Sequence, residues 1–149
     1  MSVAKAEPTP HKLEGALLKE FILAGKARLT VHSNSQLDAR TTYEVKKAKD
    51  GNVYFVGFLC GPNNEEDYRY LGIISVPSLQ FKLTAKSMAG RDSRAYKAFQ
   101  YVWGCLMNNR PIEHVTVLHE GRCGKCGRVL TVPESIMRGI GPECAKGGL

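Results

Sequence analysis

Three cysteines near the C-terminal end of the chain have the residue type and spacing of a metal site. Cys123 and Cys126 are separated by two residues, so one tight turn can direct both sulfurs at a single ion about 2.3 Å away. Cys144 closely follows Pro142, and proline favours a first helical turn, where a thiolate lies near the positive end of the helix. The pattern predicts a structural zinc ion (Zn2+) in a treble-clef or zinc-ribbon-like module over residues 119–149.

His119 is the predicted fourth zinc ligand, because it lies within one short turn of Cys123. His114 is an alternative, although it lies a strand-length earlier in the chain, and a water molecule is another. Four protein ligands would leave no open coordination position for a catalytic water, which is typical of a structural site.

The same residues could in principle support other chemistry. A zinc deaminase needs His-x-Glu far upstream of Pro-Cys-x-x-Cys, whereas His119 and Glu120 are adjacent and the paired cysteines follow at once. A redox pair or simply buried thiols are the remaining readings. The module has few large apolar residues, so a metal ion would supply the stability that its thin core lacks. No HExxH, GxSxG or phosphate-cradling loop occurs, and the chain is predicted to be non-catalytic.

The segment EGRCGKCGRVLTVPESIMRGIGPECA, residues 120–145, resembles an uncharacterised zinc-binding domain that is common in bacteriophage and prophage proteins. That family has a CGRCGR-L-T-PES core followed by a GIGPEC element. Upstream segments, including Cys60-Gly-Pro-Asn-Asn, resemble the part that often precedes the finger, so the likeness spans roughly residues 28 to 145. The resemblance implies zinc and a phage-type origin, and no agreed activity.

The helices and strands that would position this module are predicted to form an α+β fold. Residues 1–11 are predicted to be a disordered leader, and residues 12–118 an α+β domain. Alternating apolar residues predict an antiparallel sheet of about five strands, covered by one or two helices. The expected strands are 27–33, 41–47, 53–60, 70–76, a short 79–83, and 113–118. Cys60 and Cys105 fall in apolar segments and are expected in the core.

Two helices are predicted. The first covers residues 13–24, and its expected buried face is Leu13, Ala16, Leu17, Phe21 and Ala24. The second begins at a cap on Asp92 or Ser93, runs to about Asn108 and covers the sheet.

Positive charge suggests a polyanionic partner. The chain has 149 residues and a formal net charge of +7, and residues 82–110 contain six basic side chains and one acid. Basic residues interleaved with tyrosines favour DNA or RNA, since cations track phosphates while aromatic rings stack on bases. The predicted contacts are Arg69, Arg91, Arg94, Lys97 and Arg128. A module that binds or inhibits a host defence or replication protein is the alternative, and a basic surface that only maintains solubility would look the same.

Location follows from what the sequence lacks. It has no run of about 18 apolar residues and no apolar segment near residue 1 that would make a secretory signal. Five cysteines, an odd number, favour thiols or metal ligands over disulfides. The expectation is a cytoplasmic protein of a bacterial host with no membrane partner.

Overall fold

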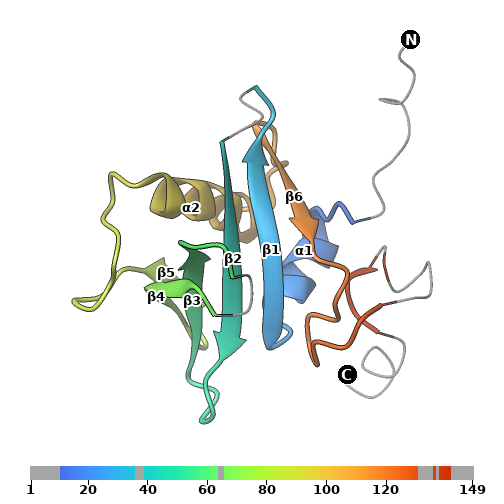
Figure 1. Ribbon diagram of the computed structural model, residues 1–149, viewed down its shortest axis with the longest axis horizontal. Coiled ribbons are helices and arrows are strands. Elements are labelled where there is room, and N and C mark those ends of the chain that lie inside the picture. Colours follow the sequence, from blue (N-terminus) through green and yellow to red (C-terminus); the bar gives the residue numbers. More distant parts are fainter. Residues whose placement is uncertain (1–10, 36–38, 64–65, 131–135, 137, 142–149) are drawn as a thin grey trace.

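Six segments rich in β-branched and aromatic residues form one antiparallel sheet (Figure 1). The computed structural model describes residues 11–35, 39–63, 66–130, 136 and 138–141. The strands are β1 (Lys26–Ser33), β2 (Arg40–Lys47), β3 (Val53–Leu59), β4 (Tyr68–Ser75), β5 (Phe81–Lys82) and β6 (Val115–His119). Their order is β5-β4-β3-β2-β1-β6. The predicted α+β class is confirmed, with six strands where about five were expected.

Strand periodicity decides which side chains enter the core. On β1, Ala27, Leu29 and Val31 are buried and their neighbours face the other side. In the β1–β2 register, Ala27 lies opposite Val45 and Leu29 opposite Tyr43. Because successive side chains of a strand point to opposite faces, one face of the sheet forms the core and the other carries the polar residues.

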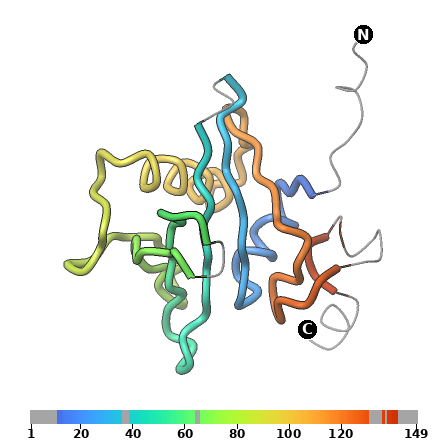
Figure 2. Tube along the Cα trace, viewed as in Figure 1, coloured from blue at the N-terminus to red at the C-terminus, as the bar shows by residue number. Residues whose placement is uncertain are grey.

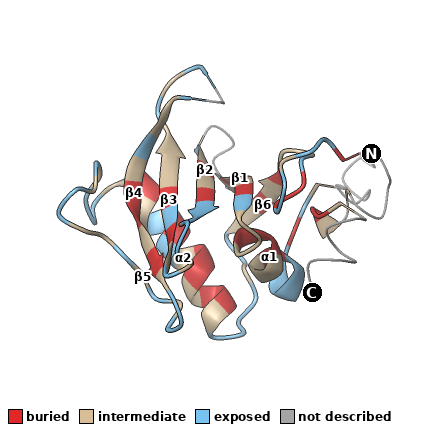
Figure 3. Ribbon diagram, turned by 90° about the horizontal axis from the view of Figure 1, so that it is seen from below, coloured by how far each residue is buried: buried red, intermediate tan, exposed pale blue. Residues whose placement is uncertain are grey.

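Two helices cover the core face. Both α1 (Gly15–Ile22) and α2 (Arg94–Met107) lie on the same side of the sheet (Figure 3). The predicted Ser93 cap is confirmed, since the Tyr96 amide donates to the Ser93 hydroxyl at 3.1 Å. Neither helix, nor any other helical turn in the described part of the chain, is long and apolar enough to cross a membrane.

Buried tyrosines tie both helices to the sheet. The Tyr43 hydroxyl donates to the carbonyl of Ala95 in α2 at 2.6 Å, and the Tyr54 hydroxyl donates to the carbonyl of Leu23, just after α1, at 2.9 Å. Burial raises the pKa of both phenols, Tyr43 the more strongly, so both remain neutral donors.

The predicted buried face of the first helix is confirmed at Phe21 and was wrong at Ala16 and Leu17, which are exposed. Leu18, Phe21 and Ile22 are the buried residues of α1, whereas Leu17 is 45% exposed. Leu13 is also buried, but it precedes the helix. The periodicity was counted from a residue that the helix does not contain.

The chain before α1 runs along β6. Lys12 pairs with Leu118, the Leu13 amide donates to the Val117 carbonyl at 2.9 Å, and the His119 amide donates to the His11 carbonyl at 3.0 Å. Residues 1–10 of the predicted leader lie outside the described residues.

After β6 the chain turns back toward the start of β1 (Figure 2). The Lys26 amide donates to the Gly124 carbonyl at 2.6 Å, which joins this segment to the sheet. A Cβ on Gly124 would lie 2.6 Å from the Phe21 ring, so only glycine allows this approach to the helix. A small second core forms here from Cys123, Leu130 and Ile140, with Ala24 and Ile136 against it.

Candidate metal centre and basic surfaces

Residues 121–130, called the knuckle below, form a tight turn around the Cys123 sulfur. An isolated bridge joins Arg122 to Val129, and the Cys123 amide donates to the Arg128 carbonyl at 2.9 Å. Inside the turn, the amides of Lys125 and Cys126 point at the Cys123 sulfur, at 3.3 and 3.5 Å. Amides directed at the first sulfur are what a thiolate metal ligand needs to stabilise its negative charge.

The same contacts set the acidity of Cys123. Burial by itself raises the pKa of this thiol, but hydrogen bonds from the backbone of Gly141, Cys126 and Lys125 outweigh burial and lower the pKa to about 7. Since the thiolate is the form that binds a metal, Cys123 is chemically suited to be a ligand. Cys126 is exposed at the other end of the turn.

The approach to Cys144 also meets Cys123. Gly141 lies three residues before Cys144, and a Cβ on Gly141 would be 4.0 Å from the Cys123 sulfur. Cys144 itself lies outside the described residues. The chain therefore returns to the first predicted ligand just before it reaches the third.

His119 lies at the end of β6, where the fold buries its ring. It is 3% exposed and both of its ring nitrogens are engaged with backbone groups. The Gly121 amide donates to Nδ1 at 2.9 Å, and Nε2 donates to the Ile136 carbonyl in a short hydrogen bond. His11 stacks on the ring with a centroid separation of 4.7 Å. At least one ring nitrogen would have to lose its backbone partner before His119 could bind an ion.

The described residues contain no group of three or more His, Cys, Asp or Glu side chains that could hold a metal. Among the described residues, His119 therefore does not form a metal-binding group with Cys123 and Cys126. His114 is exposed just before β6, at the far end of that strand from the knuckle, and its ring lies 5.7 Å from the Tyr101 ring. Zinc binding therefore remains a prediction, and it depends most on Cys123, Cys126 and Cys144.

The two other cysteines differ from each other. Cys105 is buried in α2, as expected, whereas Cys60 is exposed and its expected place in the core was wrong. Cys60 directly follows the last residue of β3, where the strand has already left the core.

The five basic residues predicted to contact nucleic acid are exposed and lie on three separate elements. Arg91, Arg94 and Lys97 lie on or beside α2, Arg69 on β4, and Arg128 in the knuckle. Arg69 is paired with Phe58, and Phe58 with the buried Tyr43, so Arg69 is on the face of the sheet that α2 covers, whereas Arg128 lies in the knuckle beyond β6.

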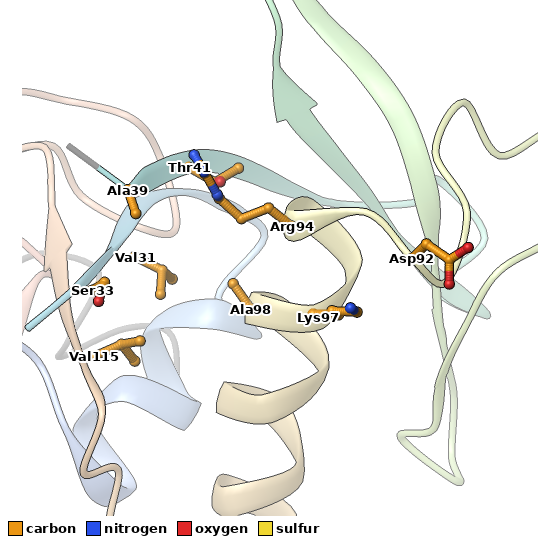
Figure 4. Close-up of a pocket in the computed structure, with 9 residues that line it drawn as sticks. All are labelled: Val31, Ser33, Ala39, Thr41, Asp92, Arg94, Lys97, Ala98 and Val115. Atoms are coloured by element: carbon orange, nitrogen blue, oxygen red, sulfur yellow. The ribbon is translucent and has the colours of Figure 1, made fainter. Parts of the chain in front are cut away.

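A cavity of about 370 Å³ lies beside the first turn of α2. Val31 and Val115 contribute apolar walls, and Figure 4 shows the Arg94 side chain extending toward Thr41, with Lys97 on the same helix. Asp92 also lines the cavity, so its charge is mixed.

A stronger concentration of positive charge lies where the knuckle meets the opposite face of the sheet. A groove of about 230 Å³ is lined by Lys26 and Arg28 of β1, Lys46 of β2 and Arg122 of the knuckle. Glu44 is the acid in this lining; it pairs with Arg28 at 3.1 Å and Lys46 at 3.6 Å. Strand alternation placed these residues away from the core, but their meeting with Arg122 depends on tertiary structure that the sequence does not reveal.

Comparison with known proteins gives one match, to the C-terminal part of the chain. A profile described as a family of unknown function (DUF6011) matches residues 114–147. The match covers β6, the knuckle and Cys144. No curated protein and no solved structure matches this chain.

Proposed function

We propose that this protein binds nucleic acid through the groove between the knuckle and the uncovered face of the sheet, and that a structural zinc ion holds the knuckle in place. The uncovered face is the face opposite α1 and α2, against which no described helix packs. The observation that carries the proposal is the lining of the groove: four cations, Lys26, Arg28, Lys46 and Arg122, with one acid, Glu44. Closely spaced cations of this kind attract phosphates and release bound counterions from a nucleic-acid strand.

The cysteines of the knuckle support the proposed zinc site. Cys123 has the hydrogen bonds and the lowered pKa of a thiolate ligand, and Cys126 lies on the same turn. When bound, zinc would fix the turn by joining Cys123 and Cys126 to Cys144, and Arg122, next to Cys123, would be fixed with it. The phage-type origin suggested by the C-terminal motif stays a prediction.

The binding test compares two charge-matched triple variants. Lys26→Gln/Lys46→Gln/Arg122→Gln removes cations of the groove, and Arg91→Gln/Arg94→Gln/Lys97→Gln removes the same charge from α2. Affinity for fluorescent oligonucleotides is measured by anisotropy from low to moderate salt. Each lost phosphate contact should reduce the slope of log K against log salt by about 0.7 for single strands or 0.9 for duplex.

The groove variant should bind more weakly and show a smaller slope of log K against log salt, while the α2 variant should keep the affinity and slope of the wild type. Loss confined to the α2 variant would transfer the function to the helix surface. A wild-type protein with no salt-sensitive affinity for DNA or RNA would overturn the proposal.

A protein partner is the second candidate. Val129, next to Arg128 in the knuckle, is 58% exposed, so a protein partner could contact this apolar side chain. A stoichiometric partner retained after nuclease treatment, and lost on Val129→Ser, would favour this alternative.

A further inference from the structure

A row of side chains crosses the uncovered face of the sheet. Lys26 is paired with Lys46, Lys46 with Phe55, Phe55 with Ile73, and Ile73 with Lys82. Directly paired residues on one face have Cβ atoms about 4.5–5.5 Å apart, so each member of the row touches or nearly touches the next. Two lysines therefore lie on one side of Phe55 and one lies beyond Ile73 on the other.

Phe55 is the exceptional member of this row. Its neighbours Tyr54 and Val56 are buried in the core, whereas Phe55 points the other way and is 46% exposed. No described helix covers this face, so packing against a helix does not explain why a phenylalanine stands at position 55. A large aromatic ring held in water among lysines suits a partner that combines flat apolar groups with negative charge.

The next row adds an arginine and a tyrosine, and Tyr68 lies close to that arginine. Arg28 is paired with Glu44, Glu44 with Gly57, and Gly57 with Tyr70. Gly57 leaves the centre of this row without a side chain. The Arg28 guanidinium carbon lies 5.5 Å from the centre of the Tyr68 ring, although β2 and β3 separate their strands, so these side chains reach toward each other over the sheet.

The rings are held in place before any partner binds. Phe55 and Tyr70 meet edge to face with a centroid separation of 6.4 Å. The Tyr70 hydroxyl is 2.9 Å from the Thr84 hydroxyl, which fixes the far end of that ring. Rings fixed in this way lose little conformational freedom when a base stacks on them.

We infer that the uncovered face of the sheet binds single-stranded nucleic acid, with unpaired bases on Phe55 and Tyr70 and the phosphate backbone along Lys26, Lys46 and the groove beside the knuckle. This inference rests on the proposed function and names the form of its ligand. A duplex offers phosphates to the lysines but keeps the flat faces of its bases in the stack. A single strand offers both, and an open sheet with aromatic side chains is a known platform for such strands.

The test measures the affinity of the full-length protein, as purified, for three probes: a labelled dT12 strand, a U12 strand and a DNA hairpin duplex. Stacking acts on base faces and does not require a particular sugar, so both single strands should bind. Each should bind at least tenfold more tightly than the duplex at the same salt concentration.

Phe55→Ala should weaken single-strand binding roughly 5- to 150-fold, the range that alanine substitution of one stacking residue gives. It should leave the salt slope unchanged because no phosphate contact is lost, and Phe55→Trp should restore the affinity. Leu17→Ala is the matched control, since Leu17 is 45% exposed on α1 and lies away from this face. Circular dichroism and thermal melting establish that each variant is folded.

Salt-sensitive binding with no single-strand preference, or with an unchanged affinity in Phe55→Ala, would overturn this inference and leave the proposed function standing. An equal loss of duplex and single-strand affinity in Phe55→Ala would overturn it too. No binding to any of the three probes would overturn both.

Discussion

At the scale of single residues, His119 shows that a spacing typical of a zinc ligand does not determine the surroundings of the ring. Its distance along the chain from Cys123 was compatible with zinc binding, but spacing does not say where a ring points. In the folded chain its two nitrogens satisfy the Gly121 amide and the Ile136 carbonyl. Those partners are backbone groups, which carry no signal in the sequence.

This environment predicts a pH effect. Burial lowers the pKa of His119; the hydrogen bond to Ile136 acts in the opposite direction, and the neighbouring His11 lowers the pKa further. The unfolded chain therefore binds more protons, so the contribution of His119 to stability is complete above about pH 6.5 and is lost as the pH falls below it. NMR titration of the ring should show protonation at a lower pH than in a free peptide. A pKa at or above the ordinary value would contradict this.

The cysteines allow a direct prediction about metal. Purified protein should contain about one zinc per chain, and Cys126→Ser or Cys144→Ser should abolish it, because three thiolates are the core of the predicted ligand set. Cys60→Ser is the control: Cys60 is exposed and outside the knuckle, so zinc content should not change. Metal analysis by mass spectrometry measures all four proteins. Metal-free wild type with a protease-resistant C-terminal region would exclude the site.

At the scale of elements, the strands could be predicted closely because their period of two persists over several residues. β1, β2 and β3 begin and end within one residue of the predicted limits. The first helix was harder. It has eight residues, barely two turns, and Gly15 at its start has φ +60, so the chain changes direction after Leu13. The helical periodicity of α1 therefore cannot be extended back to Leu13, which precedes this turn.

The corrected face of α1 predicts unequal effects for two adjacent leucines. Leu18→Ala should lower the free energy of unfolding by about 2–5 kcal/mol, because it leaves a cavity in the main core. Leu17→Ala should change it by no more than about 0.5 kcal/mol, as is usual at exposed sites. Chemical denaturation of both variants measures the difference. Equal destabilisation would show that the helix is turned from the orientation described.

At the scale of the whole molecule, the sequence could indicate a basic protein but not where its charges meet. Arg122 and Lys26 are far apart in sequence, and they line one groove because the fold brings the knuckle to the start of β1, where the Gly124 carbonyl accepts the Lys26 amide. The cations of α2, which belong to the basic stretch 82–110, lie on the other side of the sheet. Which face a helix covers is decided by packing, so charge density along the chain did not identify the groove.

The unequal size of the two cores predicts the response to metal removal. The knuckle is held by a small cluster around Cys123, Leu130 and Ile140, whereas the sheet and helices share a much larger core. A chelator should therefore make the C-terminal segment sensitive to protease while the far-UV circular dichroism of the sheet persists. Limited proteolysis with mass spectrometry locates the cleavage. Simultaneous loss of the sheet signal would mean that the two cores unfold as one unit.

The short pairing of residues 11–13 with β6 has a consequence for behaviour at high concentration. An outermost strand with free amides and carbonyls is a template on which another chain can add, and that route leads to aggregates. Here the Leu13 and His119 amides already have partners on the facing segment. At the opposite border, β5 has only two residues and one of them is Lys82. Both borders are therefore poor templates, and a protein with an exposed phenylalanine on its open face can still resist strand-to-strand polymerisation.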